Sequence, residues 1–234
     1  MRQLLNLILI ALSLISCKNA NSSKSVNQRD NDSIRIEESF IDSTNIGIKG
    51  FFKINVQQIR QVEKGVYVTF DLFKKQDSKW ILIQSYKMEK DGITSLDIVI
   101  TDFNNDRLND MTVQTGAAAR GSNEIKSLFL FDKSKGELKL IKNSSNYPNI
   151  RYNKELDCID AWLIYGGCST IFFKLDSDTL REFAGVELFD SILTIYQIDS
   201  NGKKIILEER KDDKLDTYTR FSNYKPLKID KENK

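Results

Sequence analysis

Apolar residues recur at every second position in several short segments, and each segment ends in a polar or glycine-containing turn. Residues 66–73 alternate in this way, a polar turn follows at 74–78, and residues 80–86 return as a second segment. A strand with one face toward a core shows this period, because successive side chains point to opposite faces. The two segments therefore predict a β-hairpin.

Further segments repeat the pattern along most of the chain. Three more hairpins are predicted, at 128–131 with 138–141, 161–165 with 170–175, and 192–198 with 204–207. Asn201-Gly202, in the last of these, is the strongest short hairpin signal. Residues 54–62 fit a short helix or a strand end, and residues 179–184 fit one helical turn. The predicted fold class is all-β: an antiparallel β-sandwich or a propeller-like stack of hairpins, with few short helices.

The N-terminus has the proportions of a secretory signal. Arg2 precedes a largely apolar stretch at 4–14 that is too short to span a bilayer with margin. It ends in Leu14-Ile15-Ser16-Cys17, which resembles the lipobox of bacterial lipoproteins. The resemblance implies that residues 1–16 are cleaved and that Cys17 carries two acyl chains on its thioether and a third on its amine. The alternative is an ordinary secretory signal with a chance cysteine.

The residues after Cys17 are polar and show no apolar period. We expect residues 17–35 to form a flexible lipidated tether and residues 36–234 to form a single all-β domain. Lys18 stands where an aspartate would retain a lipoprotein in the inner membrane. By analogy with lipoprotein sorting, this indicates an outer-membrane lipoprotein, on its periplasmic or its surface face, with the membrane as partner through Cys17.

Composition excludes several classes of site. The chain has no histidine, and Cys158 and Cys168 are the only cysteines after Cys17. Histidine-based catalysis, thiolate zinc sites and iron–sulfur clusters are therefore excluded. The 35 basic and 33 acidic residues nearly cancel and are interspersed, so no nucleic-acid surface is indicated. We expect a protein that is not an enzyme.

One polar loop has the spacing of calcium ligands. Oxygen-bearing side chains stand at positions 1, 3, 5 and 9 of the segment that begins at Asp102, and position 7 offers a backbone carbonyl. A curled loop turns alternate positions toward one ion, and oxygen ligands suit calcium. The predicted ligands are Asp102, Asn104, Asp106, Leu108 and Asp110.

The loop resembles the calcium loops of the FG-GAP and VCBS β-repeat families. It departs from the usual calcium-loop pattern at position 6, where Arg107 replaces glycine, and at position 12, where Val113 replaces glutamate. The alternative is an ordinary Asn- and Asp-rich surface turn that needs no metal.

The order of motifs over residues 60–210 resembles bacterial envelope lipoproteins related to periplasmic lysozyme inhibitors. Lys79-Trp80 lies in a hairpin, the DxNxD loop follows, and a small-residue loop leads into the hairpin at 128–141. The resemblance implies an all-β fold, a calcium loop, and inhibition of a peptidoglycan hydrolase by an inserted loop.

Two turns offer candidate partner-binding residues. Arg120 and Gly121 lie in the small-residue loop 116–123, where a partner's backbone could approach closely. Tyr165 stands beside Gly166-Gly167 at a hairpin end. The alternatives are a flexible connection at the first turn and a packed tyrosine at the second.

Cys158 and Cys168 are a possible disulfide. An oxidising compartment favours the bond. If Gly166-Gly167 forms a two-residue turn, however, the hairpin register places the sulfurs far beyond bridging distance. Both possibilities remain open at this point.

Two functions fit these features. The first is an envelope lipoprotein with a calcium-stabilised β domain that acts as a structural or adhesive binding module. The alternative is an inhibitor or immunity-type protein that binds a peptidoglycan hydrolase. The near-neutral charge argues against a strongly basic lysozyme as the target, since an acidic inhibitor would gain association rate.

Overall fold

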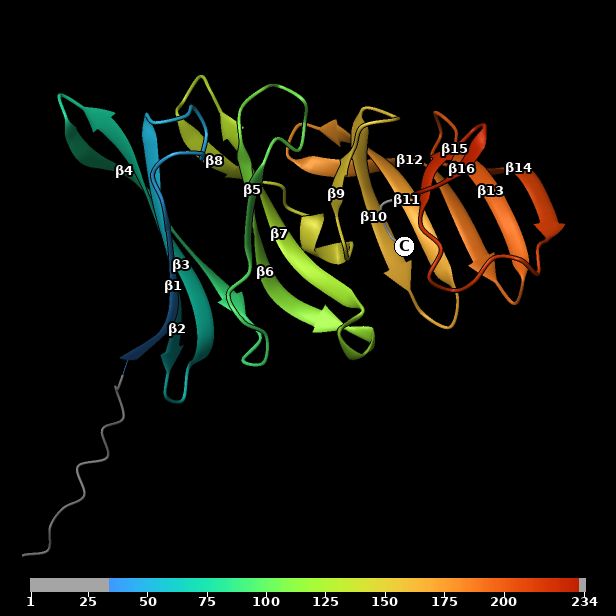
Figure 1. Ribbon diagram of the computed structural model, residues 1–234, viewed down its shortest axis with the longest axis horizontal. Helices are drawn as coiled ribbons and strands as arrows, with labels where there is room; N and C mark the ends of the chain where they lie inside the picture. Colours follow the sequence, from blue (N-terminus) through green and yellow to red (C-terminus); the bar gives the residue numbers. More distant parts are fainter. Residues whose placement is uncertain (1–33, 232–234) are drawn as a thin grey trace, which may run out of the picture. The chain divides into compact units, whose positions relative to one another are not determined.

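The computed structural model describes residues 34–231, and the predicted signal peptide 1–16, Cys17 and most of the tether lie outside the described residues. Within that range the fold is all-β, as the alternation predicts (Figure 1). In place of the few short helices expected, these residues contain only two 3₁₀ turns, η1 (Ala119–Gly121) and η2 (Ser144–Asn146).

Three antiparallel sheets follow one another along the chain, and in each the strands pair in sequence order. Sheet 1 contains β1 (Ile34–Asp42), β2 (Phe52–Gln61), β3 (Gly65–Gln76) and β4 (Lys79–Lys90). Sheet 2 contains β5 (Ile98–Thr101), β6 (Asp110–Ala118), β7 (Asn123–Asp132) and β8 (Glu137–Leu140). Sheet 3 contains β9 (Arg151–Asn153), β10 (Cys158–Ile164), β11 (Cys168–Asp176), β12 (Thr179–Phe189), β13 (Ile192–Ile198) and β14 (Lys204–Lys211). A hairpin of β15 (Phe221–Tyr224) and β16 (Leu227–Ile229) ends the fold.

The four predicted hairpins are present as β3–β4, β7–β8, β10–β11 and β13–β14. The two segments for which a helix was considered are strands instead. Residues 54–62 lie mostly in β2, which pairs along its whole length with β3, and residues 179–184 begin β12. Both segments are strands because they pair with neighbouring strands, and such tertiary contacts routinely override the local preference for helix or strand.

Sheet 2 is covered on both faces. Phe129 and Phe131 of β7 pack into a core shared with sheet 1, whereas Leu128 and Leu130 pack into a second core shared with sheet 3. Alternate residues of one strand thus serve two cores, which explains why 128–131 is a continuous apolar run. The rings of Phe70 and Phe129 meet edge to face across the first core, with centroids 5.2 Å apart.

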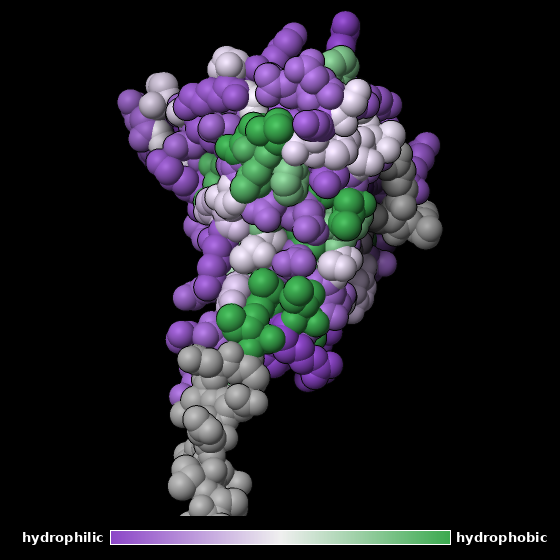
Figure 2. All heavy atoms as spheres, turned by 90° about the vertical axis from the view of Figure 1, so that its left-hand side faces the viewer, coloured by the Kyte–Doolittle hydropathy of each residue, from purple (hydrophilic) through white to green (hydrophobic). Residues whose placement is uncertain are grey.

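The outer faces of the end sheets differ from each other. Sheet 3 packs its second face on the C-terminal hairpin, where Phe221 is fully buried with Phe172 and Val186. In sheet 1, Ile36, Ile41 and Leu82 are more than half exposed. Figure 2 views this side of the domain and shows hydrophobic side chains in separate patches among hydrophilic ones.

Candidate functional site

The predicted metal loop connects β5 to β6, and Asp102 organises its backbone. Asp102 Oδ1 accepts hydrogen bonds from the N–H groups of Asn104 and Asp106, both at 3.2 Å, and Oδ2 accepts one from Arg107 at 2.8 Å. Arg107 has φ of 70°, so position 6 is left-handed, as a calcium loop requires. The loop is curled by its own carboxylates.

Asp110 lies beneath this loop and is fully buried. Its carboxylate accepts hydrogen bonds from the N–H groups of Phe103 at 2.7 Å and Phe131 at 2.8 Å. Burial raises the pKa of Asp110 to about 7, and the negative charges of Asp106 and Asp102 act in the same direction. The three carboxylates therefore repel one another, and a nearby cation would relieve that repulsion.

The donor set fits a hard cation by chemistry, but its arrangement does not form a closed cage. Asp106 Oδ1 accepts the N–H of Leu108 at 2.8 Å, and its Oδ2 faces the amide of Asn104 at 3.0 Å. Among residues 34–231, no three His, Cys, Asp or Glu side chains converge closely enough to hold a metal by themselves. An ion here would need the Asn104 amide oxygen and the Leu108 carbonyl as well.

The loop touches all three sheets. Asn109 forms a backbone bridge with Gly47, which follows β1 of sheet 1. Asn105 Nδ2 donates to Asp157, in the turn before β10 of sheet 3, at 3.1 Å. Since the loop itself belongs to sheet 2, a change in its conformation would reach every sheet of the domain.

The predicted partner-binding residues lie on two neighbouring turns. Arg120 and Gly121 form η1, between β6 and β7, and both are exposed. Ala119 and Arg120 are left-handed, with φ of 49° and 57°, so this tight turn displays the arginine. Tyr165, in the β10–β11 turn, is 44% exposed, and its ring stacks on that of the half-exposed Phe189 at 6.4 Å.

Asn123 joins the two turns. Its Nδ2 donates to the carbonyl of Ile164 at 2.9 Å, and the N–H of Ile164 donates to its Oδ1 at 3.0 Å. Asn149 adds bonds to the carbonyls of Ser122 and Trp162 at 3.0 and 2.8 Å. Figure 1 shows the β6–β7 and β10–β11 turns at the same end of their sheets. We call the exposed residues Arg120, Gly121, Tyr165 and Phe189 the paired-loop surface.

The possible disulfide does not form. Cys158 and Cys168 are both free and buried. Cys158 begins β10, whereas Cys168 begins β11 and pairs with Ile164 at the far end of the same ladder. The hairpin register thus separates the sulfurs, although the turn has three residues rather than two. Burial raises the pKa of the two thiols to about 12 and about 11, which makes them poor nucleophiles at neutral pH.

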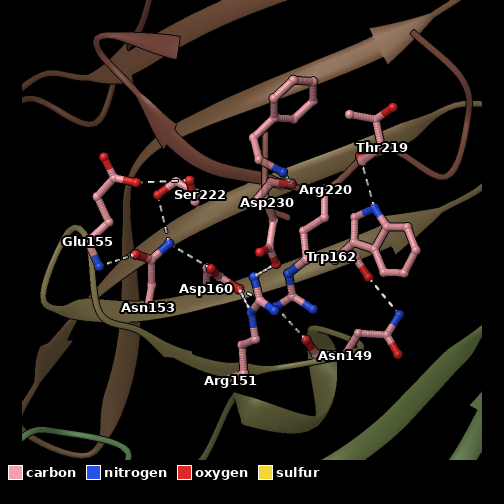
Figure 3. A network of polar contacts seen from close by, with 12 residues as sticks. Asn149, Arg151, Asn153, Glu155, Asp160, Trp162, Thr219, Arg220, Ser222 and Asp230 are labelled. Atoms are coloured by element: carbon pink, nitrogen blue, oxygen red, sulfur yellow. Dashed lines mark hydrogen bonds and ion pairs between the residues drawn. The ribbon is translucent and has the colours of Figure 1, made fainter. Parts of the chain in front are cut away.

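A buried charge network that the sequence analysis missed attaches the C-terminal hairpin to sheet 3 (Figure 3). Asp160 of β10 is fully buried and pairs with Arg220, which is 5% exposed, and with Arg151 of β9 at 3.5 Å. Arg151 also pairs with Asp230, the residue after β16. Arg220 lies 60 residues from Asp160, and Asp230 lies 79 residues from Arg151, so no local pattern could have revealed these contacts.

Comparisons with known proteins place the chain in no family. No family model matches, and no curated protein does. One similar solved structure is described as that of a Xanthomonas type IV secretion system related protein; it is 12% identical, covers 76% of this chain and 97% of that chain, and has a TM-score of 0.47. In the described range, no helix is long and apolar enough to cross a membrane.

Proposed function

We propose that this protein is a lipid-anchored binding module of the bacterial cell envelope that holds a protein partner at its paired-loop surface and performs no catalysis. The supporting observation is the pair of hydrogen bonds between Asn123 and Ile164. These bonds bring Arg120 and Tyr165, from turns more than 40 residues apart, to one place. The lipobox-like Leu14-Ile15-Ser16-Cys17 supports the anchor.

The paired-loop surface has the side chains that dominate protein interfaces. Arginine and tyrosine are enriched among interface residues that contribute most to affinity. The asparagine contacts hold both turns in place before a partner arrives, which reduces the entropy lost on binding. Tyr165 is further fixed by its hydroxyl contact with Ser169 at 2.6 Å.

Calcium is part of the proposal as a structural ion in the metal loop. Burial raises the pKa of Asp110, and the charges of Asp106 and Asp102 add to this effect. The ion would offset the repulsion among these three carboxylates. Because the loop also contacts sheets 1 and 3, the bound ion would stabilise the whole β domain rather than one hairpin.

A variant at the surface tests the binding role. The tagged full-length protein, extracted from its host's envelope in mild detergent, should co-purify with a defined partner. Arg120→Glu should remove that partner, because it reverses the charge of the one charged residue in the paired-loop surface. Lys133→Glu is the matched control, since it makes the same charge change in the exposed β7–β8 turn. Equal recovery with both variants would contradict the proposal.

A second candidate is inhibition of a peptidoglycan hydrolase, and the display of Arg120 on a tight exposed turn favours it. Such enzymes rely on active-site carboxylates, which an inserted arginine would engage. An excess of the purified protein should slow the clearing of a cell-wall suspension by the target hydrolase. The Arg120→Ala variant should no longer slow it, so that clearing returns to its uninhibited rate. If the wild-type protein leaves clearing by several classes of hydrolase unchanged, the inhibitor function is contradicted and the structural or adhesive function remains.

A further inference from the structure

β14 is an edge strand of sheet 3. It pairs with β13 on one side, and no strand of the described range pairs with its other side (Figure 1). All of its residues are exposed. Such an edge offers a row of free N–H and C=O groups to another strand, and proteins usually shorten or cover it. The opposite edge of sheet 3 is short in this way, since β9 has three residues.

The backbone of Ile206 points to the open side of β14. The N–H of Asp199 donates to the carbonyl of Lys203 at 3.0 Å, so the backbone of Lys203 faces β13. Successive residues of an antiparallel strand direct their backbone groups to alternate sides. Those of Ile206, at the third position after Lys203, therefore face away from β13 and are available to a second strand.

The sequence around Ile206 is complementary to itself when two copies run antiparallel. Two lysines, three apolar residues and two glutamates follow one another: Lys203, Lys204, Ile205, Ile206, Leu207, Glu208 and Glu209. The three apolar side chains are 45%, 49% and 40% exposed. When Ile206 stands opposite its own counterpart, Ile205 lies opposite Leu207, and the lysines of each copy lie against the glutamates of the other. Apolar pairs and opposite charges across two strands stabilise a sheet.

The outermost of these charges lack partners within one chain. Lys203 and Glu209 are exposed, and neither forms an ion pair with another described residue. Lys204 and Glu208, by contrast, each pair with a residue of their own chain. A second copy would therefore neutralise the two charges that one copy leaves unpaired.

A bulge limits how far this pairing extends. Ile206 and Glu208 pair with consecutive residues of β13, so Leu207 between them has no partner there. Bulges increase the local twist and restrict pairing along an edge. Regular pairing is therefore confined to the residues about Ile206, and the long lysine and glutamate side chains make the outer contacts. A contact of this size is weak and reversible, so its detection requires a covalent trap.

We propose that two copies of this protein form a symmetric dimer by pairing β14 edge to edge, with Ile206 beside the twofold axis. The two copies of sheet 3 then form one continuous sheet. The contact uses the same residues from both copies and closes on itself, so no third copy adds to it.

Disulfide trapping of the full-length protein in mild detergent tests this dimer. In Ile206→Cys the two thiols stand opposite each other, where paired Cα atoms lie about 5.5 Å apart, within the reach of a disulfide. Ile41→Cys is the matched control, since Ile41 is an exposed isoleucine of β1, an edge strand of sheet 1. Cys158 and Cys168 are buried, and the wild-type protein, which retains Cys17, gives the background. Under a mild oxidant, Ile206→Cys should form dimers about tenfold faster than Ile41→Cys, because pairing raises the effective concentration of the thiols.

A charge swap tests the pairing that the sequence predicts. Adding Lys203→Glu to Ile206→Cys should slow dimer formation about fivefold, because two attractive contacts per dimer become repulsive. Adding Glu209→Lys as well restores opposite charges and should recover the original rate. Equal rates from Ile206→Cys and Ile41→Cys, or a double swap no faster than Lys203→Glu alone, would overturn the proposal. Crosslinking of Ile206→Cys to a different protein and not to itself would also overturn it.

Discussion

At the scale of single residues, Asp110 determines how the metal loop responds to pH. Its pKa rises from 3.8 to about 7 on folding, so the folded protein holds this proton more tightly than the unfolded chain does. The contribution of this proton to the free energy of unfolding is fully present below about pH 4, and it is lost as the pH rises through 7. A shift of this size corresponds to about 4 kcal/mol.

Asp110→Asn removes this titration. With chelator present, the free energy of unfolding of the wild-type protein should fall between pH 4 and pH 8 relative to that of the variant, by up to about 4 kcal/mol. Urea unfolding at several pH values measures the difference directly. Parallel pH profiles for the two proteins would show that Asp110 is ionised throughout.

Substitution of Asp106 tests whether the same loop binds calcium. Calcium at a hundredfold excess over its Kd should stabilise the wild-type protein by about 2.7 kcal/mol, which is about 5–10 °C in melting temperature. Asp106→Ala should abolish this increase, and Arg107→Gly should strengthen it, because glycine adopts the left-handed φ of 70° without strain. A wild-type melting curve that calcium does not move would identify the loop as an ordinary turn.

At the scale of elements, the C-terminal hairpin depends on its buried charges. Arg220→Met leaves Asp160 with one arginine instead of two and should cost about 3–5 kcal/mol of unfolding free energy in urea titrations. Adding Asp160→Asn should recover part of the loss. Arg210→Met is the control: its pair with Glu208 is solvent-accessible, so the loss should be at most about 1 kcal/mol. Equal losses at both arginines would contradict a structural role for the network.

The elements also show what the sequence could predict. Alternation located β3 because its inward residues Val66, Val68, Phe70 and Leu72 are all apolar. β4 was located by the polar turn before it, since its less exposed side also includes Gln84 and Lys90. β2 was ambiguous because Gln58 occupies a buried position that alternation expects to be apolar. β9 contains only three residues, too few for any period to be visible.

The candidate site was predictable only in part. The metal loop and the two turns carry local signals: ligand spacing, glycines and an exposed arginine. The contact between those turns has no such signal, because it depends on Asn123 meeting the backbone of Ile164, 41 residues away.

At the scale of the whole molecule, the proposed anchor lies outside the described residues and is tested separately. Cys17→Ala should release the protein from the membrane fraction and abolish incorporation of labelled palmitate, because the thioether and the new amine are the predicted acylation sites. A wild-type protein that takes up no label would contradict the lipoprotein assignment and leave the β domain unaffected.

The central claim is that the paired-loop surface faces a protein partner, and photo-crosslinking in intact cells tests it most directly. A benzophenone-bearing phenylalanine would replace Tyr165 in one variant and Phe51 in another. Phe51 is an exposed aromatic residue in the β1–β2 loop. The same loop contacts the metal loop through Gly47. We predict a discrete crosslinked product from position 165 that disappears when Arg120→Glu is added, and none from position 51. The same products from both positions, or none from position 165, would contradict the account.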